Sequence, residues 1–211
     1  MDHSHIATLA QIAVLYLLAA ASPGPNVLII SQLSLSGRRR LGVLTAVGIS
    51  VGSVAWAVLA MMGVAAVLAR VDWLYAAVRT AGALYLLWFG ARLLWKAGPG
   101  HEASAAAGVQ APAGGRAALR TGLLTSLTNP KSGAFWTSVF AAVFPGDAPA
   151  WLYPATAALI AALSLGWHLT IASLFSMPRV QSAYRGLRRP IDALCGAILV
   201  ALGLKIALGR P

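Results

Sequence analysis

The chain has 211 residues, of which 59% are hydrophobic and only 10% charged, and its mean hydropathy is +0.76. Soluble domains average about 45–50% apolar and about 25% charged residues. This composition therefore excludes an ordinary soluble protein and predicts an all-α integral membrane protein. The net charge of +11 could suggest nucleic-acid binding, but most basic residues fall in clusters between long apolar segments. That is the pattern of cytoplasmic loops, so we expect a lipid bilayer around the chain and no nucleic-acid partner.

Six segments are apolar and long enough to cross a bilayer, whose hydrocarbon core of about 30 Å takes about 20 helical residues. We predict transmembrane helices at residues 6–36, 41–69, 73–95, 119–144, 151–175 and 191–208. Residues 6–18 of the first segment also have the length of a signal-peptide core. Because residues 1–5 contain no Lys or Arg, we expect it to be a retained helix.

The first predicted helix is interrupted near its middle by Ser22, Pro23, Gly24, Pro25 and Asn26. The two prolines remove two backbone N–H donors, and the glycine between them permits a positive φ. Carbonyls about one turn upstream lose their partners, which hydrocarbon tolerates only beside protein or water. The motif predicts an unwound substrate-binding segment, with a structural kink as the alternative.

Basic residues are clustered at positions 38–40, 92–120 and 179–189, after the first, third and fifth predicted helices. The other two connections, 70–72 and 145–149, carry little positive charge. Loops rich in Lys and Arg stay in the cytoplasm. We therefore expect both termini outside.

The second predicted helix contains Gly48 and Gly52, four residues apart. Small residues at this spacing let two helix backbones approach closely. We expect tight packing within the chain, and a homodimer contact is the alternative.

Residues 97–115 are rich in Ala, Gly and Pro and show no periodicity, which predicts a flexible cytoplasmic linker. The linker separates residues 1–96 from residues 116–211, with three predicted helices on each side. Because three is odd, the two halves must lie in opposite orientations. Each half opens with an interrupted helix, as in the inverted repeats of secondary transporters.

The fourth predicted helix is interrupted by Asn129, Pro130 and Lys131. Pro130 frees the carbonyl near Ser126, and the Asn129 side chain can satisfy broken backbone. Isolating a Lys in lipid costs at least about 2.5–3.5 kcal/mol, so an intramembrane Lys suggests a functional site. Two readings of Lys131 stay open: it binds substrate, or it is structural and satisfies freed carbonyls of the first helix.

His168 lies inside the fifth predicted helix and is a possible proton relay, although a hydrogen-bonded packing role is the alternative. The sequence contains no phosphate-binding loop, no His-Glu-x-x-His motif and no Gly-x-Ser-x-Gly elbow. We therefore expect no enzymatic activity, no cofactor and no metal site.

In combination, these motifs resemble the LysE/RhtB family of bacterial amino-acid exporters over nearly the whole chain. The best-marked parts are residues 22–26, Gly48 with Gly52, residues 81–90, residues 122–135, and Gly196 with Gly203. The resemblance implies a bacterial inner-membrane protein that exports amino acids or related small zwitterions, driven by the membrane potential or a proton gradient. Some relatives carry an acid inside the fifth helix, whereas residues 163–168 contain none.

We expect a substrate site between the first and fourth helices of an alternating-access exporter. Free N–H groups at a half-helix start, with Lys131, would bind the carboxylate. Freed carbonyls around residues 22–25, with Asn26 and Asn129, would bind the ammonium. An exporter of another small solute or ion, and a non-catalytic assembly subunit, are the alternative functions.

Overall fold

The computed structural model of the chain describes residues 3–22, 24–68, 72–98 and 112–208. Within these ranges the chain forms α-helices and no β-strand, so the predicted all-α fold is confirmed. In chain order the helices are α1 (His3–Ala21), α2 (Pro25–Leu35), α3 (Arg39–Leu68), α4 (Asp72–Ala97), α5 (Gly115–Leu127), α6 (Pro130–Val143), α7 (Leu152–Leu174) and α8 (Pro178–Leu208).

Four helices in the described part of the chain have both the length and the apolar composition of a membrane span. They are Ser4–Ala21, Arg39–Gly63, Leu152–Leu174 and Arg189–Leu208. Large apolar side chains on these helices and on α4 face outward, among them Val14, Leu59, Met62, Leu84 and Leu194. An outer surface of this kind suits lipid and not water, as a multi-pass membrane protein requires.

The centre of the molecule is built around α6. Trp136 and Phe140 of this helix are almost completely buried, with exposed fractions of 2% and 0%. Side chains from α1, α3, α4, α7 and α8 complete the same apolar cluster. The short helix α6, which begins at Pro130, is therefore enclosed by the long helices.

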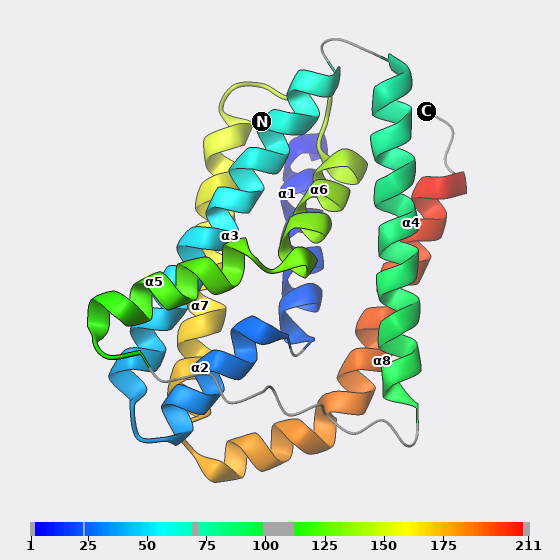
Figure 1. The fold of residues 1–211 in the computed structure, drawn as a ribbon. Coiled ribbons are helices and arrows are strands. Elements are labelled where there is room, and N and C mark those ends of the chain that lie inside the picture. Colours follow the sequence, from blue (N-terminus) through cyan, green and yellow to red (C-terminus); the bar gives the residue numbers. More distant parts are fainter. Residues whose placement is uncertain (1–2, 23, 69–71, 99–111, 209–211) are drawn as a thin grey trace.

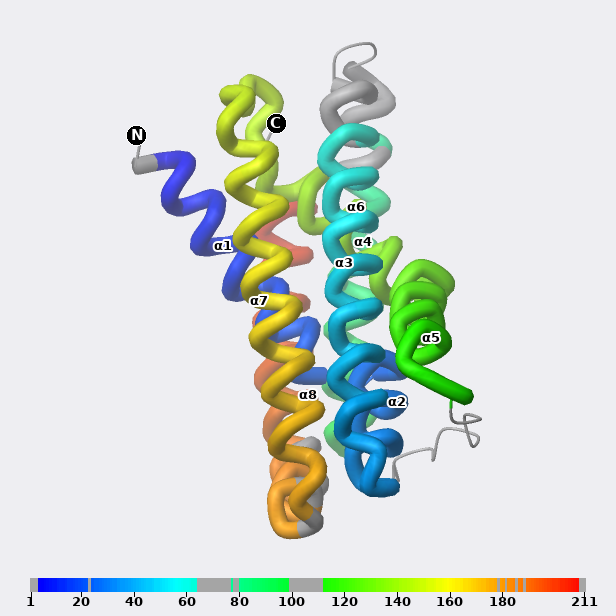
Figure 2. The backbone as a smooth tube through the Cα atoms, turned by 90° about the vertical axis from the view of Figure 1, so that its left-hand side faces the viewer, coloured from blue at the N-terminus to red at the C-terminus, as the bar shows by residue number. Residues whose placement is uncertain are grey.

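The long helices pack in pairs. Helix α3 runs beside α7 and carries α5 on another face, while α4 runs beside α8 (Figures 1 and 2). In Figure 1 the α2–α3 and α7–α8 corners and the end of α4 lie at the lower end, and the two labelled termini lie towards the upper end.

Glycines set the closest helix contacts. A Cβ on Gly48 would collide with the carbonyl of Leu119, a Cβ on Gly122 would collide with the carbonyl of Thr45, and one on Gly52 would lie 2.6 Å from the Ser126 Cβ. The predicted tight packing within the chain is thus confirmed, between α3 and α5. Because α5 covers these glycines, they are not the face of a homodimer.

Helix α8 differs from the prediction, because it begins at Pro178 and not near residue 191. The segment 178–189 is amphipathic and rich in Arg. It contains no continuous apolar run, which is why the sequence predicted a loop there. Pro190 lies inside the helix, where it removes one hydrogen bond and favours a kink. In Figure 1 the first part of α8 crosses the lower end of the molecule before the helix turns upward.

Candidate functional site

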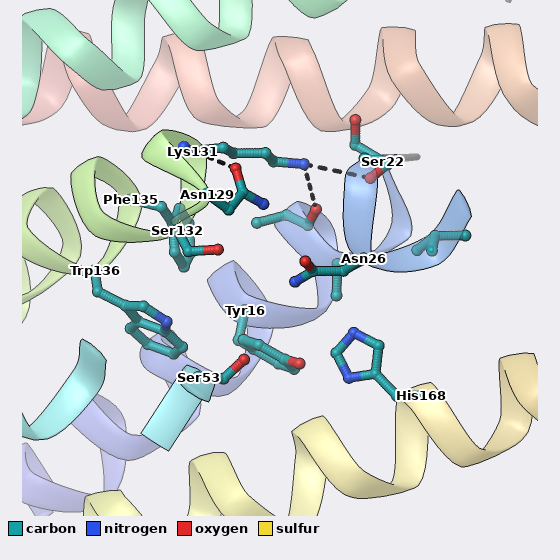
Figure 3. A pocket seen from close by; sticks show the side chains of 14 residues that line it. Tyr16, Ser22, Asn26, Ser53, Asn129, Lys131, Ser132, Phe135, Trp136 and His168 are labelled. Atoms are coloured by element: carbon teal, nitrogen blue, oxygen red, sulfur yellow. Dashed lines mark hydrogen bonds between the residues drawn. The ribbon is translucent and has the colours of Figure 1, made fainter. Parts of the chain in front are cut away.

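A cavity of about 60 Å³ lies where the end of α1 and the starts of α2 and α6 meet α7 (Figure 3). It has room for about four water molecules, since one water needs about 10–15 Å³ by the same measure. Six of the predicted site residues line it: Ser22, Gly24, Asn26, Asn129, Lys131 and His168. Two interrupted segments more than 100 residues apart in sequence thus line a single cavity.

The carbonyls at the end of α1 bond to side chains from elsewhere in the chain. The Lys131 ammonium donates to the carbonyls of Ala19 at 3.1 Å and Ser22 at 3.3 Å. The hydroxyl of Tyr184, in α8, donates to the carbonyl of Ala21 at 2.8 Å. These donors replace helical N–H groups that Pro25 and the end of α1 cannot supply.

The Lys131 ammonium satisfies freed carbonyls of α1, as a structural role requires, and it also lines the cavity. Its Nζ lies 4.9 Å from the centre of the Phe89 ring, within the range of a cation–π contact. A Cβ on Gly24 would lie 3.7 Å from the same atom. An ammonium has three donors, of which the two carbonyls take two. The structure therefore leaves both roles of Lys131 possible.

The start of α6 satisfies its own N–H groups. Asn129 is the N-cap, and its Oδ1 accepts the backbone N–H of Lys131 at 3.0 Å. The backbone N–H of Ser132 donates to the Asn129 carbonyl at 3.0 Å. The carbonyl of Ser126, four residues before Pro130, accepts the indole N–H of Trp56 at 3.1 Å. The sequence predicted that Pro130 would free this carbonyl.

The start of α2 is different. Gly24 is the N-cap with no side-chain cap hydrogen bond, and its backbone is extended, with φ −133° and ψ −175°. Gly24 therefore does not use the positive φ that a glycine permits at this position. The first helical bond runs from the N–H of Leu28 to the Gly24 carbonyl at 3.1 Å. The N–H groups of Asn26 and Val27 precede it and have no partner within the helix, and both residues line the cavity.

On the opposite side of the cavity from Lys131, Tyr16 lies near His168 (Figure 3). His168 has an exposed fraction of 3%, and its Nδ1 lies 2.8 Å from the Ser164 carbonyl. This hydrogen bond is the one expected of a histidine with a packing role, but the His168 ring also lines the cavity. The proton relay stays a prediction.

Sequence reasoning missed the aromatic part of the wall. Tyr16, Phe135 and Trp136 line the cavity, and the Tyr16 ring stacks on Trp136 with centroids 5.6 Å apart. An aromatic residue in an apolar helix gives no signal that separates a cavity wall from ordinary core.

Three predicted site residues lie elsewhere. Pro130 lines a neighbouring groove, against Trp56 and Tyr85. Pro25 occupies the first position of α2 and acts through the backbone. Pro23 lies outside the described residues.

The chain is similar to known efflux proteins over most of its length. The chain is 32% identical over 204 residues to the threonine efflux protein of Salmonella typhi and 33% identical over 204 residues to that of Escherichia coli (strain K12). Each alignment covers 94% of this chain and 97% of the relative. The leucine efflux protein of Enterobacter sp. (strain 638) is 36% identical over 118 residues, which cover 56% of this chain and 54% of the relative.

No solved structure matches the chain. The model of the LysE type translocator family matches residues 17–210, a range that contains both interrupted segments and every residue of the cavity except Tyr16. The chain therefore belongs to the LysE type translocator family of membrane proteins.

Proposed function

We propose that this protein exports amino acids, or closely related small zwitterions, from the cytoplasm across the bacterial inner membrane. The observation that carries the proposal is the Lys131 ammonium at the wall of a small cavity, beside the N-terminus of α2. A fixed cation next to a helix N-terminus favours a carboxylate. The efflux proteins among the relatives support the same substrate class.

The carboxylate would bind between Lys131 and the N–H groups of Asn26 and Val27. The sequence suggested N–H groups at a half-helix start, and we assign this role to α2, because the N–H groups at the start of α6 are already bonded to Asn129. Asn129 then acts by holding the first turn of α6, and with it Lys131, in place.

The ammonium needs an acceptor other than the freed carbonyls that the sequence suggested. Those of Ala19, Ala21 and Ser22 accept bonds from Lys131 and Tyr184. The Oδ1 atom of Asn26 is buried and has no hydrogen-bond partner within the described residues. We assign the ammonium to this atom, which lies between Lys131 and His168 in Figure 3.

The proposed transport cycle is alternating access by two inverted three-helix repeats. The repeats would pair α1–α2 with α5–α6, α3 with α7, and α4 with α8. Supporting this assignment, α2 and α6 both begin with Pro at the first turn, and α3 packs on α7 as α4 packs on α8. A two-fold axis between the repeats would bring each helix against its own counterpart, as α3 lies against α7 and α4 against α8. The breaks at residues 22–24 and 128–129 would serve as hinges.

The proposed orientation places the lower end of Figure 1 in the cytoplasm and both termini outside. The basic segments at residues 38–40 and 179–189 belong to corners at that end. The proposed driving force is the membrane potential or the proton gradient, with His168 as the candidate relay.

Efflux from loaded cells tests the proposal. Cells with and without this protein are loaded with a panel of dipeptides, and the appearance of free amino acids outside is followed. We expect faster loss of one or a few amino acids, which collapse of the proton gradient abolishes. If no amino acid leaves faster while the protein is in the membrane, the proposal is refuted.

In that case two alternative functions would remain: export of another small solute or ion, and a role as an assembly subunit. Reconstitution separates them, because an exporter works alone in liposomes. A homodimer, if one forms, would use a face other than Gly48 and Gly52.

A further inference from the structure

The side of the cavity away from Lys131 contains a buried hydroxyl with no partner. Tyr16 has an exposed fraction of 5%, and its hydroxyl makes no hydrogen bond of normal geometry within the described residues, although Ser164 lies nearby. A buried polar group without a partner costs about 1–3 kcal/mol. Such groups are rare in proteins unless water or a ligand meets them.

His168 presents a matching acceptor. Its Nδ1 lies 2.8 Å from the Ser164 carbonyl. A carbonyl only accepts hydrogen bonds, so the neutral ring carries its proton on Nδ1, and Nε2 is left as an acceptor. Figure 3 shows the ring beside the Tyr16 side chain and below Asn26, at the cavity wall.

Parts of the cavity wall near this pair are apolar or already bonded. Val27 and Trp136 supply apolar wall. Ser53 also lines the cavity, but its hydroxyl donates to the Ile49 carbonyl at 3.1 Å. The stack on Trp136, with an interplanar angle of 13°, fixes the direction of the Tyr16 ring. At this end of the cavity the Tyr16 hydroxyl is therefore available as a donor and Nε2 of His168 as an acceptor.

We propose that Tyr16 and His168 form a subsite for a hydroxyl on the side chain of the transported amino acid. This assignment rests on the proposed function, which places the carboxylate at Lys131 and the ammonium at Asn26. The ligand hydroxyl donates to Nε2 of His168 and accepts from the Tyr16 hydroxyl. The pair thereby selects threonine over valine, which has the same shape but carries a methyl group in place of the hydroxyl.

Purified full-length protein in liposomes tests the subsite, with threonine and valine counterflow measured side by side without an ion gradient. We expect wild-type protein to favour threonine by about tenfold or more, because a site built to bond a hydroxyl rejects the isostere that lacks it. Tyr16→Phe should lower the threonine-to-valine counterflow ratio about tenfold, because it removes the hydroxyl that the threonine side chain bonds.

Two further variants make the test robust. His168→Asn keeps an amide that can bond the Ser164 carbonyl but removes Nε2, and it should lower the ratio in the same direction. Tyr153→Phe is the matched control, because Tyr153 contacts Phe144 outside this cavity, and its ratio should equal that of wild type.

Equal counterflow of threonine and valine by wild-type protein overturns the subsite and leaves the exporter standing. A ratio that neither Tyr16→Phe nor His168→Asn changes does the same. Absence of counterflow for every amino acid overturns the proposed function and the subsite with it.

Discussion

Replacement of Lys131 separates its two possible roles. Lys131→Met keeps most of the side-chain volume but removes the charge and all three donors. The carbonyls of Ala19 and Ser22 then lose their partners, and each orphaned acceptor costs up to about 1–3 kcal/mol. Because the cavity admits water, we expect a stability loss near the lower end of that range.

The effect on transport should be larger than the effect on folding. A hydrogen bond to a charged group contributes about 1.5–3 kcal/mol, so loss of the carboxylate anchor should slow export about 10- to 150-fold. Lys131→Gln distinguishes the charge from the hydrogen bonds, since its neutral amide can still donate to the freed carbonyls. If Lys131 is only structural, this variant exports normally, whereas an anchor role predicts a loss close to that of Lys131→Met.

The assay is efflux of labelled amino acid from liposomes that contain equal amounts of each variant. Lys205→Met is the control, because Lys205 is exposed in the last turn of α8, and it should export like wild type. Undiminished efflux by Lys131→Met, with normal protein yield, would refute the anchor role and move the carboxylate to another part of the molecule.

Three other substitutions test the supports of the site. Tyr184→Phe leaves the Ala21 carbonyl without its donor and should lower the free energy of unfolding by about 1 kcal/mol. The melting temperature should fall; an unchanged melting temperature would mean that water replaces the lost hydrogen bond. Gly122→Ala forces α5 away from α3 and should cost about 1–3 kcal/mol, whereas Gly63→Ala, with nothing within 4 Å of its Cβ, should be neutral in the same melting assay. Asn129→Ala removes the N-cap of α6 and should cost about 1 kcal/mol; Asn129→Asp keeps an acceptor, so equal losses in both variants would contradict the capping role.

The parts of the fold that follow from local chemistry could be predicted from the sequence. Apolar run length locates α3, α4 and α7 closely, because a bilayer imposes the length of each span. Proline chemistry identified Ser126 as a freed carbonyl before its donor was known. The hydrogen bonds from Lys131 to freed carbonyls of the first helix could also be predicted, because a buried ammonium requires acceptors and freed carbonyls require donors.

The parts that depend on distant contacts could not be predicted. The side-chain donor to the Ser126 carbonyl is Trp56, 70 residues away, and the donor to the Ala21 carbonyl is Tyr184, 163 residues away. Nothing in the local sequence of either donor indicates such a partner. The start of α8 was missed for a different reason. An amphipathic helix buries only one face, and the mean hydropathy of such a segment is too low to indicate a membrane helix.

The glycine contact between α3 and α5 has a consequence for how the protein is made. Gly48 and Gly52 lie in the first half of the chain, but the helix that covers them comes from the second half. During synthesis α3 is expected to enter the membrane with a groove at Gly48 and Gly52 still uncovered. The groove is filled only after α5, residues 115–127, has left the ribosome. The two halves are therefore expected to assemble when expressed as separate chains, while either half alone would expose its groove to lipid or to quality-control proteases.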